Sequence, residues 1–433
     1  MSRLEESGQA PASNDVRRGV PSPVVWLLSA CCALSVANVY YAQPLLDAIA
    51  HDFDIPPAHI GGVITATQIG CALALVFVVP LGDILDKKRL MSLQLIGLTL
   101  ACIGVAMASS RVALLLSMAS AGLLGTAMTQ GLIAYAATLA PDRERGRVVG
   151  AAQSGVVVGL LMARTFAGAV ADLAGWRMVY WMSAAIAIAM LATLGQRLPA
   201  LPKTPMPLRY GALLRSMATL LREERVLRVR GTIGLLMFAA FGTFWGALVL
   251  PLSAPPHAMS HTAIGAFGLV GAAGAIASAR AGRLADRGFG DLTTGVALVF
   301  LLAAWLPLLW TTQSIALLIA GIVLLDAGGQ AIHVVNQSMI FGARPEARAR
   351  LVGCYMLFYS AGVGLGSIAS TTAYAYAGWS GVCMLGALTS AAAMVFWLVT
   401  RRNESTAGCA GTADLRTVGV NAKRCANQNP SGA

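Results

Sequence analysis

Charged residues are scarce in this sequence. Asp, Glu, Lys and Arg account for 12% of its 433 residues, whereas 57% are hydrophobic, and the mean hydropathy is +0.70. Soluble domains contain about 25% charged residues. The composition therefore excludes an ordinary soluble enzyme or binding domain, and it predicts an all-α protein that crosses a membrane many times.

Other features are missing as well. The first 23 residues are polar and contain no apolar stretch typical of a cleaved signal peptide, so we expect none. The sequence has no glycine-rich phosphate-binding loop, which argues against an ATP-driven pump. Six of the eight cysteines lie in apolar segments and two lie in the polar C-terminal tail, so we expect neither a disulfide framework nor a metal site.

Twelve apolar segments are each long enough to cross the ~30 Å hydrocarbon core of a bilayer as a helix. The predicted spans are 24–46, 59–81, 90–108, 112–139, 148–171, 178–196, 231–252, 262–281, 292–310, 314–341, 351–376 and 381–400. The predicted parts are a cytoplasmic N-terminal tail (1–23), an N-terminal six-helix half (24–196), a cytoplasmic central linker (197–230), a C-terminal six-helix half (231–400) and a disordered cytoplasmic tail (401–433).

Lys and Arg are distributed unevenly among the loops that join these spans. Of the 31 such residues, 28 lie in the two tails, the central segment and the loops after spans 2, 4, 8 and 10, when Arg280 at the very end of span 8 is counted with the loop that follows it. Basic residues concentrate on the cytoplasmic side of membranes, so both termini are predicted to be cytoplasmic. The net charge of +12 is then a signal of topology, and we expect no nucleic-acid partner.

The two predicted halves repeat one another. Three short patterns recur 203 residues apart: AGW at 174 and 377, RVVG at 147 with RLVG at 350, and an aspartate at 83 and 286. One shift that relates loops on corresponding sides predicts a tandem duplication with parallel orientation.

The tenth span carries a polar stripe. Asp326, Gln330, His333 and Gln337 are spaced so that they share one face of a helix. Such a face is costly in lipid, because an ionisable group at mid-bilayer costs about 3 kcal/mol or more. The stripe is therefore predicted to face a bundle interior or a water-filled cavity, which makes it a transport-site hypothesis.

Arg164 and Asp326 are formally charged, lie well inside predicted spans of opposite halves and have opposite signs. We predict that they couple protons to transport together with His333, because rocking of the halves would change the distance between the two charges. Three alternatives stay open. Arg164 could extend to the outer interface, Asp326 could make a structural hydrogen bond between helices, and His333 could serve packing alone.

The loops after spans 2 and 8 carry related motifs, VPLGDILDKKR at 79–89 and GRLADRGFG at 282–290. In these loops and in its twelve spans the sequence resembles the major facilitator superfamily, and within it the drug:proton antiporter type. The resemblance implies a cytoplasmic latch in which an aspartate caps a helix and pairs with arginine to tie the two halves together. The latch residues would be Asp83, Lys87, Lys88, Arg89, Gly282, Arg283, Asp286 and Arg287.

The resemblance also implies a substrate cavity between the halves, with walls from helices 1, 4, 7 and 10 together with 2, 5, 8 and 11. Polar and aromatic residues of these helices are the expected lining. They are Asn38, Tyr41, Gln68, Gln130, Tyr135, Phe241, Trp245, Gln330, Asn336, Gln337, Tyr355 and Tyr359.

These features favour a secondary transporter of the inner (plasma) membrane, and not an enzyme, in which two halves rock around a midplane cavity. The expected activity is efflux of a small amphipathic or apolar compound, driven by the proton gradient without a cofactor. One alternative is a proton-coupled symporter that takes up an organic anion, with Arg164 as the carboxylate clamp. Another is a non-transporting membrane sensor on the same fold. We expect a small-molecule substrate, a lipid bilayer around the protein and a monomer.

Overall fold

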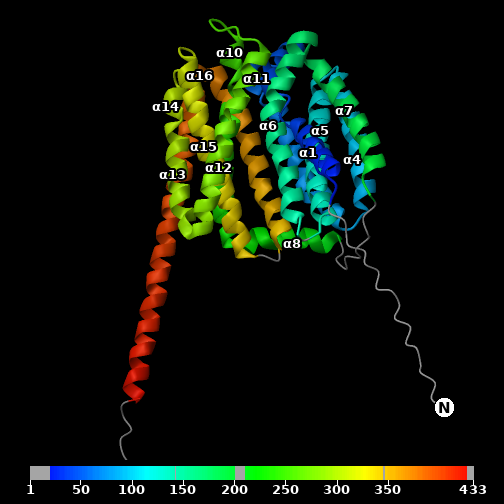
Figure 1. Ribbon diagram of the computed structural model, residues 1–433. Coiled ribbons are helices and arrows are strands. Elements are labelled where there is room, and N and C mark those ends of the chain that lie inside the picture. The colour runs from blue at the N-terminus through cyan, green and yellow to red at the C-terminus, as the bar shows by residue number, and fades with distance from the viewer. Residues whose placement is uncertain (1–19, 142, 200–209, 345–346, 427–433) are drawn as a thin grey trace, which may run out of the picture.

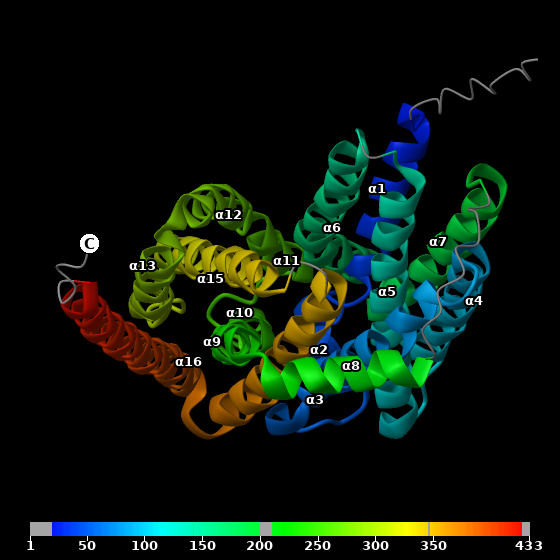
Figure 2. The same cartoon turned by 90° about the horizontal axis from the view of Figure 1, so that it is seen from below.

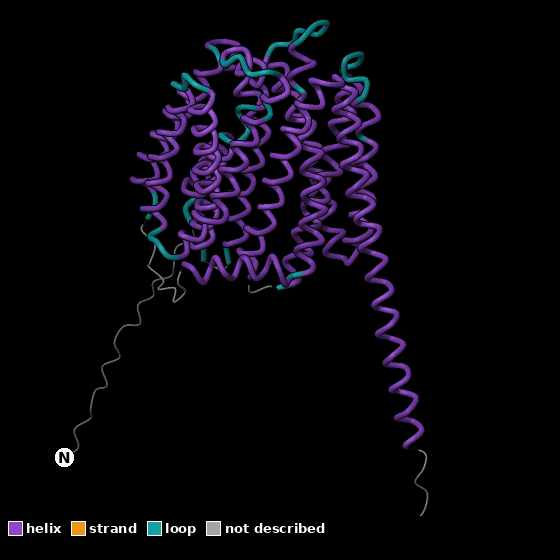
Figure 3. The backbone as a smooth tube through the Cα atoms, turned by 180° about the vertical axis from the view of Figure 1, so that it is seen from behind, coloured by secondary structure: helices purple, strands orange, loops and turns teal. Residues whose placement is uncertain are grey.

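The computed structural model describes residues 20–141, 143–199, 210–344 and 347–426. Within these ranges every regular element is a helix, and short turns join the helices (Figure 3). A helix satisfies its backbone hydrogen bonds internally, which suits segments surrounded by lipid. The all-α prediction is confirmed for the described residues.

The first group of helices forms one side of the molecule (Figure 2). Its elements are α1 (Ser22–Ala37), η1 (Gln43–Leu45), α2 (Leu46–Asp52), η2 (Pro57–His59), α3 (Gly62–Leu73), η3 (Ala74–Val78), η4 (Val79–Asp83), α4 (Lys87–Ala106), α5 (Arg111–Leu139), α6 (Arg145–Ala174) and α7 (Trp176–Arg197).

The second group forms the other side. It follows α8 (Tyr210–Glu223), which lies across the lower end of the bundle in Figure 1. Its elements are α9 (Arg225–Ala247), α10 (Val249–Ser253), α11 (His261–Val270), α12 (Ala272–Leu284), η5 (Ala285–Phe289), α13 (Gly290–Ala303), α14 (Trp305–Leu308), α15 (Ile315–Ala343) and α16 (Arg348–Ala426). We call the end that carries α8 the inner end, because the basic loops predict that it is cytoplasmic, and the opposite end, which carries α10, the outer end.

Nine helices of the described residues are long and apolar enough to cross a membrane. Two of them, His261–Leu308 and Arg350–Arg401, are 48 and 52 residues long, and each contains a glycine with positive φ where the chain turns. These glycines are Gly288 (φ 88°) and Gly378 (φ 60°). The shorter apolar helix α1 adds a further 16 residues. The arrangement is compatible with twelve passes, and the number twelve stays a prediction.

Some boundaries differ from the predicted spans. α1 ends at Ala37 instead of continuing to residue 46. Pro44 excludes a regular helix through residues 40–43, because it has no N–H to donate to the carbonyl of Tyr40 and its ring disfavours helical geometry at Gln43. α16 continues as a helix to Ala426, through most of the tail that was predicted to be disordered, and no proline interrupts it. Of the predicted linker, 200–209 lies outside the described residues, and so do 1–19 and 427–433 of the tails.

The repeat of 203 residues is visible in the backbone. Gly175 has φ 82°, and Gly378 stands 203 residues later with φ 60°. Other residues rarely adopt such angles, so glycine is required where the chain turns after α6 and at the corresponding turn within α16. Each glycine is followed by a buried tryptophan, Trp176 and Trp379.

The two groups are held together at the outer end. Thr165 Oγ1 donates to Gly265 O at 3.2 Å between α6 and α11, and a Cβ on Gly265 would lie 2.2 Å from Arg164 O. Thr65 Oγ1 donates to Gly364 O at 2.8 Å between α3 and α16. By contrast, α6 packs extensively on α11 but little on the inner continuation α12. The groups are therefore closed together outside and separated toward the inner end.

Candidate functional site

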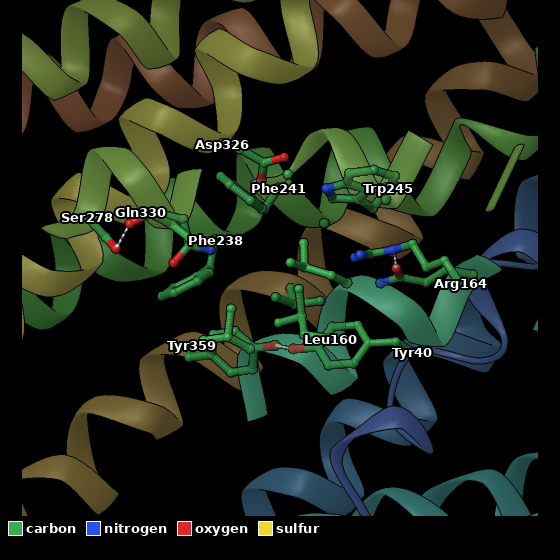
Figure 4. A pocket seen from close by; sticks show the side chains of 18 residues that line it. Tyr40, Leu160, Arg164, Phe238, Phe241, Trp245, Ser278, Asp326, Gln330 and Tyr359 are labelled. Atoms are coloured by element: carbon green, nitrogen blue, oxygen red, sulfur yellow. Dashed lines mark hydrogen bonds between the residues drawn. The ribbon is translucent and has the colours of Figure 1, made fainter. Parts of the chain in front are cut away.

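A cavity of about 130 Å³ lies between the two groups of helices (Figure 4). Six of the residues predicted from the sequence line it. They are Arg164 on α6, Phe241 and Trp245 on α9, Asp326 and Gln330 on α15, and Tyr359 on α16. The structure thus brings the two buried charges and three aromatic residues to a single space.

Arg164 enters this cavity from α6 with 5% of its surface exposed. Its Nε donates to Gln43 Oε1 at 2.6 Å, and its guanidinium carbon lies 4.0 Å from the ring centroid of Trp245 and 5.2 Å from that of Tyr40. A cation over an aromatic face gains about 0.5–2 kcal/mol. The guanidinium is therefore held inside by partners from both groups of helices and does not extend to the outer interface.

Asp326 lies on α15 and is likewise 5% exposed. Its Oδ2 atom is buried without a hydrogen-bond partner among the described residues, which also contain no salt bridge between Asp326 and Arg164. The start of α12 passes close to Asp326. A Cβ on Gly271, just before this helix, would lie 2.9 Å from Asp326 Oδ2, and one on Gly274 would lie 2.9 Å from Asp326 O. A buried carboxylate in this position is costly as an anion, because nothing in contact with Oδ2 compensates its charge.

Aromatic rings form much of the remaining wall. The Phe238 ring lies 4.4 Å from the Tyr359 ring and 6.3 Å from the Phe241 ring, centroid to centroid. The hydroxyl oxygens of Tyr359 and Tyr40 are 2.5 Å apart, which links α16 to the turn after α1. A wall of rings with a few charged groups is typical of a site for a small organic molecule.

Four other predicted residues form a separate polar cluster toward the inner end. His333 Nδ1 lies 3.3 Å from Tyr355 Oη, and His333 Nε2 lies 3.3 Å from Gln337 Nε2. Asn336 Nδ2 donates to Arg230 O at 3.1 Å. None of the four predicted residues is among the described residues that line the cavity, and the ring of Phe238 separates His333 from it.

Asn38 and Tyr41 lie within the first group of helices, away from the cavity. Asn38 Oδ1 accepts a hydrogen bond from Ser183 Oγ at 2.6 Å. The Tyr41 ring packs against the rings of Phe166 and Tyr180, at centroid distances of 5.7 and 6.4 Å. Both side chains therefore stabilise the packing of α1 against its own half.

The other predicted residues of the first group are also outside the lining. Tyr135 Oη donates to Pro199 O at 2.6 Å at the inner end of α5. Gln68 on α3 is 2% exposed, and its amide atoms have no partner among the described residues. Gln130 is half-buried on α5.

The predicted latch is not assembled in this arrangement. Lys88 Nζ donates to Leu198 O at 2.8 Å within the first group, and Arg283 Nε donates to Ala279 O at 3.3 Å within the second. The side chain of Asp83 lies outside the described residues. In the described part, no hydrogen bond or salt bridge from Lys87, Lys88, Arg89, Gly282, Arg283, Asp286 or Arg287 crosses between the groups. Closure of the latch when the inner ends approach stays a prediction.

The cavity also contains polar residues that were not predicted. They are Tyr40, Gln43 and Ser278. Gln43 offered a signal, because it is a polar residue within an apolar predicted span. Tyr40 is adjacent to the predicted Tyr41, and it follows the end of α1 at Ala37 and lines the cavity instead of Tyr41.

A charged network at the outer end also joins the two groups. His261, the first residue of α11, places Nε2 3.1 Å from Asp47 Oδ1 and Nδ1 2.9 Å from Asp172 Oδ1. Asp172 Oδ2 accepts from Thr262 N at 2.8 Å and from Thr262 Oγ1 at 2.6 Å. Two carboxylates of the first group therefore bind the start of α11 in the second.

Both groups of helices match one protein family. The family model described as Major Facilitator Superfamily matches residues 25–299 and 231–421. The putative uncharacterized transporter YgaY of Escherichia coli (strain K12) is 39% identical over 378 residues, which are 86% of this chain and 94% of the relative. The probable transporter SCO4007 of Streptomyces coelicolor is 31% identical over 404 residues, which are 92% and 90% of the two chains.

Solved structures show the same fold. A bacterial homolog of the human lysosomal transporter Spinster, in its inward-facing and unoccupied conformation, matches with a TM-score of 0.67 and 16% identity over 90% of this chain and 96% of that chain. The match of the family model to both halves and the identity to relatives along most of the chain agree with the resemblance carried by the loop motifs. The chain belongs to the major facilitator superfamily of membrane transporters.

Proposed function

We propose that this transporter exports a small amphipathic or apolar compound in exchange for protons. The observation that carries the proposal is the cavity between the halves, where Asp326, Arg164 and aromatic rings surround one space. A compound that is largely apolar would be accommodated by the rings, and the two charged residues would orient any polar group that it carries.

Asp326 is the proposed proton site. An unpartnered Oδ2 favours the neutral acid in this arrangement, because protonation removes the cost of a buried charge. Arg164 belongs to the other half, so rocking changes its distance from Asp326 and with it the relative stability of acid and ion pair. Since Asp326 is also part of the cavity wall, proton and substrate would compete for one space, which is the requirement for exchange.

The contacts between the halves support alternating access. The contacts that close the outer end include hydrogen bonds between the halves, such as those from Thr165 to Gly265 and from Thr65 to Gly364, beside helix packing and the His261 network. Each such bond contributes about 0.5–1.5 kcal/mol, and binding free energy that differs between the two arrangements would shift the balance between them.

A second function is favoured by the environment of Arg164. Arg164 is the one cationic side chain among the described residues that line the cavity, and its planar guanidinium is suited to binding a carboxylate. Uptake of an organic anion together with protons would use the same Asp326 site. The third alternative, a non-transporting sensor, gains no support from relatives that are named as transporters.

We further propose a location in the bacterial inner membrane, which the bacterial relatives support, and a monomeric, non-enzymatic protein that is driven by the proton gradient without a cofactor.

A ligand screen followed by transport measurements tests the proposed function. Purified protein would be screened by thermal shift against neutral amphipathic compounds, organic cations and carboxylates, because a ligand of the native state raises its melting temperature. Cells with and without the protein would then receive each labelled ligand. Higher accumulation in cells that lack the protein supports export, and lower accumulation supports uptake. Accumulation that is independent of both the protein and the pH gradient would contradict both functions.

A further inference from the structure

A second pocket, of about 320 Å³, is lined by residues of α8 and of the segment between the end of α15 and the start of α16. α8 crosses the inner end of the bundle (Figure 2). Three arginines surround the pocket: Arg215 on α8, Arg344 at the end of α15 and Arg350 in the first turn of α16. The hydroxyl-bearing residues Ser216 and Thr219 belong to the same wall, and the remaining lining side chains are apolar. The pocket shares no lining residue with the central cavity.

The charge of this pocket is not balanced by its described residues. Arg344 Nε contacts Glu224 Oε2 at 3.1 Å, which neutralises one of the three cations. Arg350 Nη1 donates to Ser216 Oγ, and among the described residues no carboxylate pairs with Arg350 or Arg215. Like charges that converge on one space repel each other, and a bound anion would remove this repulsion.

The preference of basic residues for the cytoplasmic side does not account for this arrangement by itself. That preference places arginines in inner loops, but it does not bring three of them and two hydroxyl groups from three helices to one pocket. The hydroxyl oxygen of Ser216 accepts a hydrogen bond from Arg350, so its own hydrogen remains available for an anion.

α8 positions the pocket at the inner end of the bundle. Leu213, Met217 and Leu220 form its buried face, and the helix lies across the inner end of the bundle (Figure 1). Tyr210 Oη donates to Phe77 O of the first half at 2.8 Å. Since the other wall of the pocket belongs to α15 and α16, a ligand held there would fasten the linker helix to the second half.

We propose that this pocket binds a phosphate group, either in the headgroup of an anionic phospholipid or in a soluble phosphate compound. Phosphate oxygens accept charge-assisted hydrogen bonds from guanidinium groups and ordinary ones from hydroxyls, and basic pockets on the cytoplasmic side of membrane proteins recognise such headgroups. The site would hold α8 in place and stabilise the arrangement in which this helix touches both halves. The proposal does not depend on the identity of the transported compound.

Binding to the full chain would be measured with two probes. Inorganic phosphate would be titrated against protein in neutral detergent, with the melting temperature as the readout. In a second arm, the protein would be placed in phosphatidylcholine nanodiscs with increasing phosphatidylglycerol, and bound lipid would be counted by native mass spectrometry. The double variant Arg215→Gln/Arg350→Gln removes two pocket charges. The matched control, Arg222→Gln/Arg225→Gln, removes two exposed charges of the same linker that do not line the pocket.

We expect the pocket variant to weaken binding at least tenfold, which corresponds to about 1.4 kcal/mol, because it loses charge-assisted hydrogen bonds to the phosphate. The control should bind like the wild type. Retention of phosphatidylglycerol with a weak effect of inorganic phosphate would identify a lipid headgroup as the source, and the reverse result would identify a soluble phosphate. The proposal would be overturned if the pocket variant and the control lost binding to the same extent. It would also be overturned if the wild type were neither stabilised by inorganic phosphate nor found with bound phosphatidylglycerol. The single variant Arg215→Gln, at an exposed residue, provides the same comparison if the double variant fails to fold.

Discussion

The Nε2 atom of His261 lies 3.1 Å from Asp47 Oδ1, and this contact joins the two halves of the transporter at the outer end. The other ring nitrogen, Nδ1, faces Asp172 at 2.9 Å. An imidazole donates through both nitrogens only when it carries both protons. Closure of the outer end therefore uses a charged network in addition to the hydrogen bonds between neutral groups.

Removing one carboxylate of this network should open the outer end. The assay is the labelling of a cysteine introduced at Val363, in the cavity wall, by a membrane-impermeant thiol reagent. We predict that Asp47→Asn raises the labelling rate about tenfold, because a hydrogen bond to a charged group is worth about 1.5–3 kcal/mol. Asp54→Asn is the matched control, because Asp54 lies on the same surface and its side chain makes no contact across the halves among the described residues. Equal labelling rates in the two variants would show that the network does not hold this end closed.

The topology makes a separate prediction. Single cysteines at Asp54 and Pro256 should react with an impermeant thiol reagent added outside intact cells, whereas cysteines at Lys88 and Arg283 should react only after the membrane is permeabilised. This labelling pattern would place the basic loops in the cytoplasm. Labelling of all four positions from outside would refute the assignment of inner and outer ends.

The latch prediction concerns the rate of the conformational change. Asp286 is exposed in the inward-facing arrangement, so its proposed partner would be met only when the inner ends approach. We predict that Asp286→Asn lowers turnover by up to about fivefold and leaves ligand affinity unchanged. An exposed ion pair is worth up to about 1 kcal/mol, which corresponds to a factor of about five in rate. An unchanged turnover in a well-expressed variant, or a loss confined to affinity, would argue against the latch.

Arg164 distinguishes the two proposed functions. If the substrate is an organic anion, Arg164→Gln should lower its affinity at least tenfold, through loss of a charge-assisted hydrogen bond worth about 1.5–3 kcal/mol, and Arg164→Lys should restore part of it. If the substrate is apolar, both variants should bind it nearly as well as the wild type. Calorimetric titration with the ligand from the thermal-shift screen provides the measurement. Arg177, a half-buried residue at the outer end that does not line the cavity, supplies the control Arg177→Gln, which should bind either class of ligand as the wild type does.

The two central charges could be predicted from the sequence because charge within an apolar span is rare and has a physical cost. Arg164 and Asp326 satisfy that condition, and the structure places both in the cavity wall. Their partners could not be predicted in the same way. Gln43 reaches Arg164 because the chain breaks after Ala37, and periodicity assigned this region to an uninterrupted helix.

Residues chosen because their helices line the cavity in the resembling family lie outside the cavity lining more often than the two central charges do. Among the described residues α5, which carries Tyr135, contributes nothing to the cavity lining, and Tyr135 donates to Pro199 O instead. Tyr355 shares α16 with the lining residue Tyr359, but the rotation of this helix directs Tyr355 to Asn336. That rotation depends on packing between helices, which a single sequence does not reveal. The contact between His261 and Asp47 was not predicted for the same reason, because it depends on how the two halves meet at the outer end.

The central claim is that Asp326 carries the coupled proton, and Asp326→Asn tests it most directly. The amide mimics the neutral acid and cannot ionise, so the variant should still bind the ligand and exchange it across the membrane without energy. Transport in proteoliposomes under an imposed pH gradient is the decisive measurement. We predict that the wild type accumulates or expels substrate against its gradient and that Asp326→Asn does neither. Uphill transport by the variant with the wild-type dependence on the pH gradient would contradict the account and place the coupling site elsewhere.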